Sequence, residues 1–205
     1  MKRFFIVFLA VTLSFCACSV PGVRKGDIIF VGIPRDDAPG EYNYVHAAIL
    51  DVDADGAVMV IDATLKRGVD RHPLDSFLVD FTRHDGSYPL FEIMRLADNS
   101  QADEFVTNAC SYIGEEYDVG FAGGNGKHYC TELIYDSYVS DGNHIFTEGP
   151  LSFRDPDGTL HPYWEHYFSK LGISVPDKGT GTTPAEMRRS PVLRPVDFNL
   201  LSLKD

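Results

Sequence analysis

The sequence VHAAILDVDADGAVMVIDA, residues 45–63, consists of two apolar runs rich in β-branched residues on either side of an Asp- and Gly-rich segment. This pattern predicts a β-hairpin. If residues 53–55 form a three-residue turn and Gly56 takes the left-handed position after it, His46 pairs directly with Asp62. Directly opposed residues have Cβ atoms about 5 Å apart, so an imidazole and a carboxylate placed there can hydrogen-bond. A two-residue turn would give a different register.

The aspartates of this turn also match the first half of a calcium-binding loop. Asp51, Asp53 and Asp55 alternate and are followed by Gly56, and Asp62 falls where such a loop has its last ligand. That loop is flanked by helices and normally ends in a glutamate, whereas both flanks here have strand patterns. The preferred interpretation is therefore a polar hairpin turn rather than a calcium site.

Outward from the hairpin, apolar periodicity and turn residues predict further strands and helices. The predicted strands are residues 26–31, 45–51, 57–63 and 88–96, with a strand-like run at 192–201. The predicted helices are residues 73–81, 100–114 and 130–139. The second helix is expected to begin with a capping box from Ser100 to Asp103 and Glu104. The glycine-rich residues 120–127 predict a loop, and the tail from residue 149 is expected to be irregular.

Cys130 lies where the glycine-rich loop meets the start of a predicted helix. The partial positive charge at a helix N-terminus favours a thiolate over a thiol, so this cysteine is a candidate nucleophile. The alternative is a small buried hydrophobic residue, which suits Cys110 better because Cys110 lies within a helix beside its apolar stripe. In an oxidising compartment the two thiols are also able to form one disulfide.

A thiolate nucleophile requires an imidazole, and the imidazole requires an acceptor that orients it. Of the seven histidines, six lie in polar or loop-like surroundings, where a solvated side chain is the default. His46 differs because it stands inside a predicted strand, with Asp62 on the same face of the hairpin. The alternative is a chance alignment, with His46 as a satisfied polar residue.

The overall composition fits one packed domain. The chain has 205 residues, of which 44% are hydrophobic and 12% aromatic, which excludes wholesale disorder. With 18 Lys and Arg against 30 Asp and Glu, the net charge is −12, which argues against binding to nucleic-acid phosphates. We expect no cofactor and no metal, because His161 and His166 lack the Cys or carboxylate pattern of a zinc site.

Residues 1–18 have the features of a secretory signal. Positive residues precede an apolar run at residues 4–15, which is too short to span a bilayer comfortably. A small residue directly precedes Cys18, which resembles the lipobox of bacterial lipoproteins with Cys18 as the lipidated residue. The alternative is ordinary signal cleavage without a lipid. We expect residues 19–205 to form a single exported domain, anchored by lipid to a membrane of the bacterial cell envelope, in the periplasm or at the outer membrane.

Five segments follow one another along the chain: GDIIF at residues 26–30, VHAAI at 45–49, VIDA at 60–63, EYDVGF at 116–121 and YCTELI at 129–134. In this order a histidine precedes an acid, which precedes a cysteine. The segments and their order resemble the permuted papain-like amidases, which are the YiiX/YaeF-like branch of the NlpC/P60 superfamily, whereas unpermuted NlpC/P60 enzymes have the cysteine first. The resemblance extends over residues 26–192, with a closing segment at residues 183–191.

This resemblance implies an α+β papain-like core, with a Cys-bearing helix packed on an antiparallel, barrel-like sheet. It implies Cys130 as nucleophile, His46 as general base and then acid, and Asp62 as the residue that orients His46, where relatives often have Glu. Tyr117 is expected to line the substrate pocket or to donate to the oxyanion, or else to be a core aromatic residue. The implied reaction is hydrolysis of an amide, in a cell-wall peptide or an N-acyl amide. The alternatives are acyl transfer through the same thioester and an inactive binding module; the oligomeric state stays open.

Overall fold

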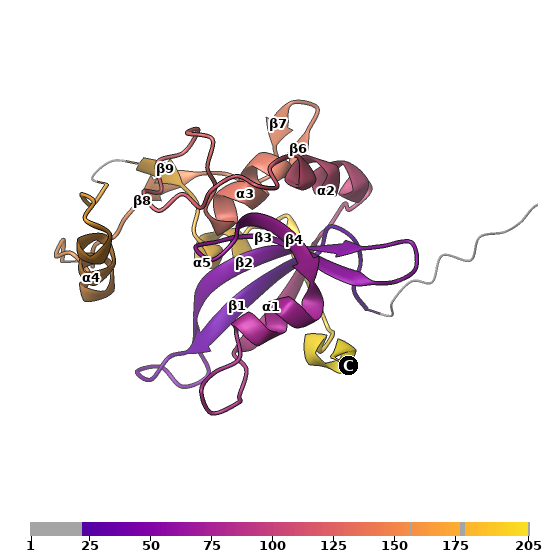
Figure 1. Ribbon diagram of the computed structural model, residues 1–205, viewed down its shortest axis with the longest axis horizontal. Helices are drawn as coiled ribbons and strands as arrows, with labels where there is room; N and C mark the ends of the chain where they lie inside the picture. Colours follow the sequence, from indigo (N-terminus) through magenta and orange to yellow (C-terminus); the bar gives the residue numbers. More distant parts are fainter. Residues whose placement is uncertain (1–21, 156, 177–178, 205) are drawn as a thin grey trace, which may run out of the picture.

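The computed structural model of the chain describes residues 22–155, 157–176 and 179–204. Its centre is a six-stranded antiparallel sheet with the strand order β10-β5-β1-β2-β3-β4 (Figure 1). The strands of this sheet are β1 (Ile28–Pro34), β2 (Tyr42–Val52), β3 (Val58–Thr64), β4 (Gly68–Pro73), β5 (Leu90–Leu96) and β10 (Leu193–Val196). Two short ribbons are formed by β6 (Val139–Ser140) with β7 (Asn143–His144), and by β8 (Gly149–Leu151) with β9 (Gly179–Gly181).

Helices cover both faces of the sheet. The helices are α1 (Leu74–Asp80), α2 (Ala102–Ser111), α3 (Cys130–Ser137), α4 (Pro162–Leu171), α5 (Pro184–Arg188) and the 3-10 helix η1 (Leu200–Leu203). In Figure 1, α2 and α3 lie above the sheet, and α1 and η1 lie below it. We call these two sides of the sheet the α3 face and the α1 face.

Strand residues alternate between the two faces, because successive side chains of a strand point in opposite directions. The buried residues of β1, β2 and β3 on the α3 face are Ile28, Phe30, Ala47, Ile49, Ile61 and Ala63. Those on the α1 face are Ile29, Val31, Ala48, Leu50 and Val60. Each large aliphatic or aromatic side chain buried in this way stabilises the fold by about 1.5–3 kcal/mol. His46 and Asp62 are in phase with Ala48 and Val60, so both start from the α1 face.

The predicted fold class is confirmed. A helix that begins with Cys130 packs on an antiparallel sheet, as expected for an α+β papain-like core. The sheet is open rather than closed into a barrel, because its edge strands β10 and β4 each pair with one neighbour. The helix predicted at residues 73–81 is α1, and the strand predicted at residues 88–96 is β5.

The capping box predicted at Ser100 is wrong. Helix α2 begins after Gln101, which makes no side-chain cap, and the helix ends at Ser111 rather than near residue 114. The backbone N–H of Ser100 instead donates to the carboxylate of Asp98 at 3.0 Å. Ser100 is therefore part of a local Asx turn before the helix, which is a competing use of the same short polar residues.

The irregular tail predicted from residue 149 is also wrong, because it contains α4. This helix has proline in its first turn and ends at Gly172, whose φ is +67°. Both are ordinary boundary signals, since proline fits the first helical position and glycine the left-handed cap. The strand-like run at residues 192–201 is only partly a strand: it is β10 followed by the start of η1.

The signal sequence and Cys18 lie outside the described residues. Among the helices that are described, none combines the length and the apolar character that a membrane crossing requires.

Candidate active site

The hairpin of β2 and β3 has a three-residue turn with Gly56 in the left-handed conformation, at φ +90°. The turn is one residue later than predicted: the N–H of Asp53 donates to the carbonyl of Ala57, and the ladder pairs Ile49 with Ile61. The predicted direct pairing of His46 with Asp62 is therefore wrong, because in this register Asp62 lies two residues away from the position opposite His46. The two residues are diagonal neighbours, which long side chains are still able to bridge.

His46 and Asp62 nevertheless make the expected contact. Nε2 of His46 donates to Oδ2 of Asp62 over 2.9 Å, and both side chains are buried. The β2–β3 ladder stops at Ile49 and Ile61, so His46 and Asp62 lie beyond its last pair. Each is still paired with its other neighbouring strand, His46 with Val31 and Asp62 with Asp70.

Cys130 lies beside His46. It is the first residue of α3, and its thiol is close enough for its hydrogen bonding and charge to raise the pKa of the His46 ring. Because Nε2 of His46 is engaged by Asp62, Nδ1 is the ring nitrogen left for the sulfur. The chain thus places a thiol, an imidazole and a carboxylate in one row.

The protonation of His46 is set by these two partners. Burial acts to lower the pKa of His46, but the hydrogen bonds and charges of Asp62 and Cys130 outweigh it and raise the pKa to about 10. The ring of His46 is also enclosed by Phe77 and Phe81, at 6.2 and 5.2 Å between ring centroids. The row therefore favours an imidazolium at neutral pH, the form that stabilises a neighbouring thiolate.

Two side chains hold the first turn of α3 in place. The hydroxyl of Thr131 donates to the carbonyl of Thr182 over 2.6 Å, which ties the helix to the chain just after β9. The carboxylate of Glu132 accepts from the backbone N–H of Tyr129 over 3.3 Å, and burial raises the pKa of Glu132 to about 7. A fixed first turn keeps the backbone N–H of Cys130 directed away from the helix, where it is available to an oxyanion.

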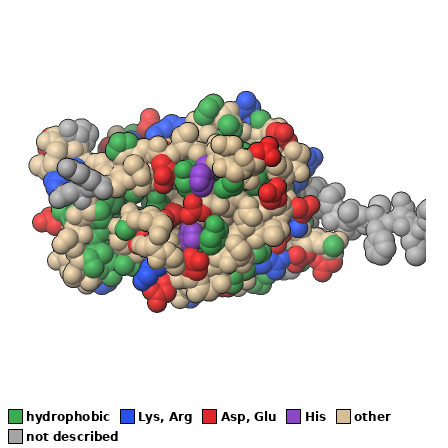
Figure 2. All heavy atoms as spheres, turned by 90° about the horizontal axis from the view of Figure 1, so that it is seen from above, with side chains coloured by type: hydrophobic (Ala, Val, Ile, Leu, Met, Phe, Trp, Pro, Cys, Tyr) green, Lys and Arg blue, Asp and Glu red, His purple; other side chains and the backbone are tan. Residues whose placement is uncertain are grey.

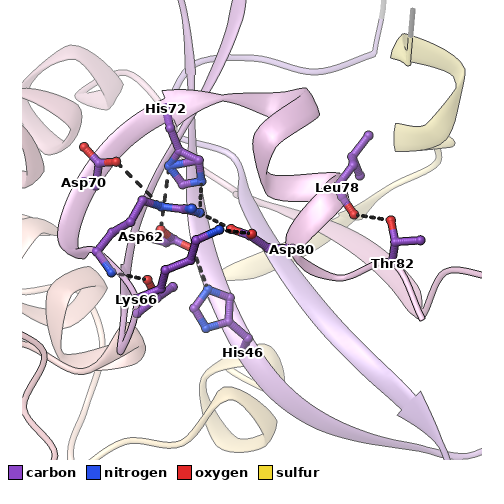
Figure 3. A network of polar contacts seen from close by, with 10 residues as sticks. His46, Asp62, Lys66, Asp70, His72, Leu78, Asp80 and Thr82 are labelled. Carbon is purple, nitrogen blue, oxygen red and sulfur yellow. Dashed lines mark hydrogen bonds and ion pairs between the residues drawn. The ribbon is translucent and has the colours of Figure 1, made fainter. Parts of the chain in front are cut away.

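A second histidine, His72, flanks Asp62 on the side away from His46. Figure 3 shows Asp62 between the two rings. Nε2 of His72 accepts from the guanidinium of Arg67 over 2.9 Å, which leaves the ring proton on Nδ1, facing Asp62. Burial lowers the pKa of His72, so the ring is neutral at neutral pH. Sequence reasoning missed His72 because it did not predict β4, although residues 68–73 follow a turn directly after β3.

A cavity of about 580 Å³ opens over Cys130. Tyr117 lines it, as expected from the sequence, together with aromatic residues from α4 and from the loop that contains Phe121. The segment of Tyr117 is fixed by a parallel bridge to His128. Burial and the nearby charge of Cys130 hold the pKa of Tyr117 well above its usual value, so its hydroxyl stays protonated and is able to donate.

The other sequence candidates are placed elsewhere. Cys110 is half-buried in α2, and both Cys110 and Cys130 are free thiols. Asp51 and Asp53 of the hairpin turn accept hydrogen bonds from Arg71 over 2.8 and 2.6 Å, so they serve as partners of a cation from β4. This arrangement agrees with the polar hairpin turn that the sequence favoured.

Comparison with known proteins identifies one family and one related fold. Residues 22–197 match the family model of the permuted papain-like amidase enzymes, YaeF/YiiX, C92 family. The crystal structure of the metalloprotein YiiX from Escherichia coli O157:H7 is similar, with a TM-score of 0.64 and 20% sequence identity over 85% of this chain and 97% of that one. No curated protein matches the chain.

The description as a metalloprotein applies to YiiX. In the described part of this chain, no three His, Cys, Asp or Glu side chains are grouped as a metal ion would require. The described residues thus offer no donor set that fits a metal ion.

Proposed function

The chain belongs to the C92 family of permuted papain-like amidases, and from this premise we propose that it is a cysteine hydrolase that cleaves an amide bond. The observation that carries the proposal is the row formed by Cys130, His46 and Asp62, which starts at a helix N-terminus and faces a cavity. A nucleophile, a base and a group that orients the base are the parts that acyl transfer needs.

The proposed reaction begins with the ion pair of Cys130 and His46. The thiolate of Cys130 attacks the amide carbonyl, and the oxygen becomes an oxyanion beside the N–H of Cys130. Tyr117 supplies a second donor, since its hydroxyl is protonated and lines the same cavity. Two donors directed at the developing charge stabilise the tetrahedral intermediate more than the planar amide.

His46 then acts as an acid. Its proton passes to the leaving nitrogen, the C–N bond breaks, and the acyl group stays on Cys130 as a thioester. A water molecule activated by the now neutral His46 attacks the thioester and releases the acid. Asp62 keeps Nε2 of His46 protonated and thereby presents Nδ1 to the sulfur in both steps.

The test is hydrolysis of a panel of muropeptides and N-acyl amides by the wild-type protein and by Cys130→Ala. We expect amide cleavage by the wild type and loss of it in the variant. A trapped thioester that is released only by an added amine or alcohol would indicate an acyltransferase instead. Absence of both cleavage and thioester across the panel would contradict the proposal and favour a binding module.

We also propose that the protein is exported and held at the cell envelope by a lipid on Cys18, for which the support is the sequence of residues 1–18. Membrane fractionation of cells that express the wild type and Cys18→Ser tests this. We expect the variant to leave the membrane fraction while its folded core is retained. Equal amounts of both proteins in the membrane fraction would reject lipidation at Cys18.

A further inference from the structure

One stretch of the central sheet has a free edge. Strand β5 pairs with β1 over residues 90–94 on one side, but with β10 only over residues 93–96 on the other. Within the part of the chain that the structure describes, residues 90–92 thus have no partner strand on the β10 side. The chain leaves this side after Val196, because the N–H of Phe198 donates back to the carbonyl of Val196 over 2.9 Å and turns the backbone toward η1.

The hydrogen-bond pattern between β10 and β5 shows which backbone groups face this free edge. The N–H of Ala97 donates to the carbonyl of Val192 over 2.8 Å, and in an antiparallel ladder such bonded positions recur at every second residue. Counted back from Ala97, the bonded positions of β5 include Phe91. Pro195, which lacks an N–H, falls at a non-bonded position, as this pattern requires. The N–H and the carbonyl of Phe91 are therefore directed at the free edge.

The two outer edges of the sheet carry features that block pairing. At β4, the N–H of Val69 donates to the carbonyl of Glu115 and the carbonyl of Val69 accepts from the N–H of Gly114, both over 2.9 Å, so a loop covers that edge. On the outer side of β10, Pro195 removes a donor. Natural sheets block their edges in such ways because an unpaired edge is a template for another chain. Residues 90–92 lack this protection and are open to strand addition.

A cavity of about 520 Å³ lies along this free edge, and we call it the β5 groove. Leu90, Phe91 and Glu92 line it from β5, and Phe198 lines it from the segment that turns away. A strand extends by about 3.3 Å per residue, so three unpaired residues of β5 match a three-residue segment of an added strand. The β5 groove therefore offers an extended peptide a place in line with β10.

The walls of the β5 groove are acidic. Its charged residues are Glu41, Glu92, Asp197 and Arg188. The guanidinium of Arg188 is already engaged, since its Nη2 donates to Oε1 of Glu92 over 2.6 Å. Glu41 and Asp197 are exposed at the rim, where Glu41 has Arg35 as a partner at 3.4 Å. Three carboxylates against one guanidinium favour a cationic peptide and repel an acidic one.

Strand alternation determines where the side chains of an added peptide point. The side chain of Phe91 belongs to the cluster on the α1 face, against which Phe198 packs. Glu92 points to the α3 face, where it accepts from the hydroxyl of Tyr44 over 2.5 Å. A peptide residue opposite Phe91 thus meets apolar rings, and its two neighbours point to the other face. The pattern that fits is an apolar residue between two basic residues.

From these observations we propose that the β5 groove is a docking site for an extended basic segment of a partner protein, which adds to β5 as a strand along residues 90–92. The central apolar residue of the segment exchanges backbone hydrogen bonds with Phe91. The flanking Lys or Arg side chains lie at the rim formed by Glu41 and Asp197. This site is distinct from the cavity over Cys130 and does not depend on the proposed hydrolase activity.

The binding test is fluorescence anisotropy with the labelled peptide amide Thr-Lys-Val-Lys-Thr. We expect saturable binding, and binding weaker by about tenfold or more for Thr-Glu-Val-Glu-Thr, which has the same length and central residue. Methylation of the valine nitrogen removes the N–H that bonds to Phe91 and should weaken binding by about tenfold. Methylation of a lysine backbone nitrogen is the matched control, because that N–H faces away from β5. No saturable binding at millimolar peptide, or equal effects of the two methylations, would overturn the proposal.

Backbone-amide NMR locates the bound peptide. The N–H of Phe91 should shift during the titration and become protected from hydrogen exchange, because it gains a partner. The N–H of Glu92 is the internal control, since at the alternate position it is directed toward β1 and its protection should not change. Shifts at exposed carboxylate residues without new protection at Phe91 would indicate attraction to the surface charge only and would reject the site.

Charge reversal at the rim tests the specificity. Acidic side chains are spread over other parts of the surface too, as Figure 2 shows for one face, so the control needs the same change of charge. Asp197→Lys and Glu41→Lys should each weaken binding of the lysine peptide by about fivefold or more. Glu104→Lys should not, because Glu104 is exposed on α2 and does not line the β5 groove. An equal loss in all three variants would overturn docking at this site.

Discussion

Oδ1 of Asp62 lies 3.9 Å from Nδ1 of His72, and within the described residues neither buried atom has a hydrogen-bond partner. The distance is too long for a hydrogen bond. It is short enough that a neutral His72, with its proton on Nδ1, directs its dipole at the Asp62 carboxylate. His72 thus acts on His46 only through Asp62, as a positioning residue, and Arg67 fixes its tautomer by donating to Nε2.

The first prediction concerns His72. We expect His72→Phe to lower kcat several-fold with little change in KM, because a dipole that faces a buried charge without a direct hydrogen bond contributes less than the ~1.5–3 kcal/mol of a hydrogen bond to a charged group. His72→Asn should recover part of the activity, since its amide is able to donate in place of Nδ1. Steady-state kinetics measure both, with His84→Phe as a control at an exposed loop histidine. Equal losses in His72→Phe and His72→Asn would mean that His72 only packs.

The second prediction concerns the alkaline limb of activity. The acid that protonates the leaving amine is His46, whose pKa is raised to about 10. Activity that needs this proton is complete well below pH 10 and is lost as the pH rises through 10. The pH profile of kcat/KM should therefore show an alkaline limb near 10, rather than near 6.5, the usual value for histidine.

Asp62→Asn tests the cause of that shift. Because Asp62 raises the pKa of His46, the variant should move the alkaline limb to lower pH. It should also reduce kcat by about a hundredfold or more, because the amide of Asn favours the wrong tautomer of the His46 ring. Asp70→Asn is the control, because Asp70 pairs with Asp62 across β3 and β4 but is half-exposed. An unchanged limb in Asp62→Asn would show that Asp62 does not orient His46.

The third prediction separates the two thiols. Cys130 lies beside a protonated imidazole, which is the setting of reactive cysteines, whereas burial, aided by Asp51, raises the pKa of Cys110. Iodoacetamide at about pH 6, below the usual thiol pKa of about 8.5, should alkylate Cys130 at least tenfold faster than Cys110. Peptide mass spectrometry over a time course measures the two rates.

Two variants complete that experiment. His46→Gln should slow the labelling of Cys130 and leave that of Cys110 unchanged, and Cys110→Ser should retain full activity. Similar, slow labelling of both thiols in the wild type would contradict the ion pair. A disulfide between Cys110 and Cys130 in active protein would contradict it more strongly, because the nucleophile would be blocked.

The extent to which the sequence predicted the site can be seen from His46, Asp62 and His72. Strand periodicity placed His46 and Asp62 on one face, and their contact is present even though the predicted register was wrong. The error arose because Gly56 takes the left-handed position in both registers, and the turn moved by one residue. The contact with His72 was missed because it depends on β4, which forms a tight hairpin with β3 but, with the sequence GVDRHP, lacks the alternation of apolar residues that marks a strand.

The cavity over Cys130 was beyond sequence analysis for a different reason. Trp164 belongs to a helix in which Tyr, Trp and Phe alternate with polar residues, so the apolar periodicity that marks a helix is hidden, although Pro162 and Gly172 mark its ends. Phe121 has a positive φ of 51° in a glycine-rich loop, a conformation that no local pattern predicts for a phenylalanine. A cavity lined by such distant segments as α4 and the Phe121 loop becomes visible only in the folded chain.

The last prediction concerns Glu132, which lies buried in the first turn of α3 and has a pKa of about 7, raised chiefly by burial. In the unfolded chain its pKa is near 4.5, so the folded state binds more protons between pH 4.5 and 7. Stability is then greatest below pH 4.5 and falls as the pH rises through 7. At pH 8 the buried carboxylate costs about 3 kcal/mol relative to a neutral group. Glu132→Gln, which is neutral and keeps an acceptor for the N–H of Tyr129, should therefore be more stable than the wild type at pH 8, by up to that amount, and by less than about 1 kcal/mol at pH 5. Urea unfolding at the two pH values measures this.

Glu186→Gln is the matched control, because Glu186 occupies the same capping position in α5 but is exposed, so its substitution should have the same small effect at both pH values. A stability difference for Glu132→Gln that does not change between pH 5 and pH 8 would mean that Glu132 is not titrating in this range.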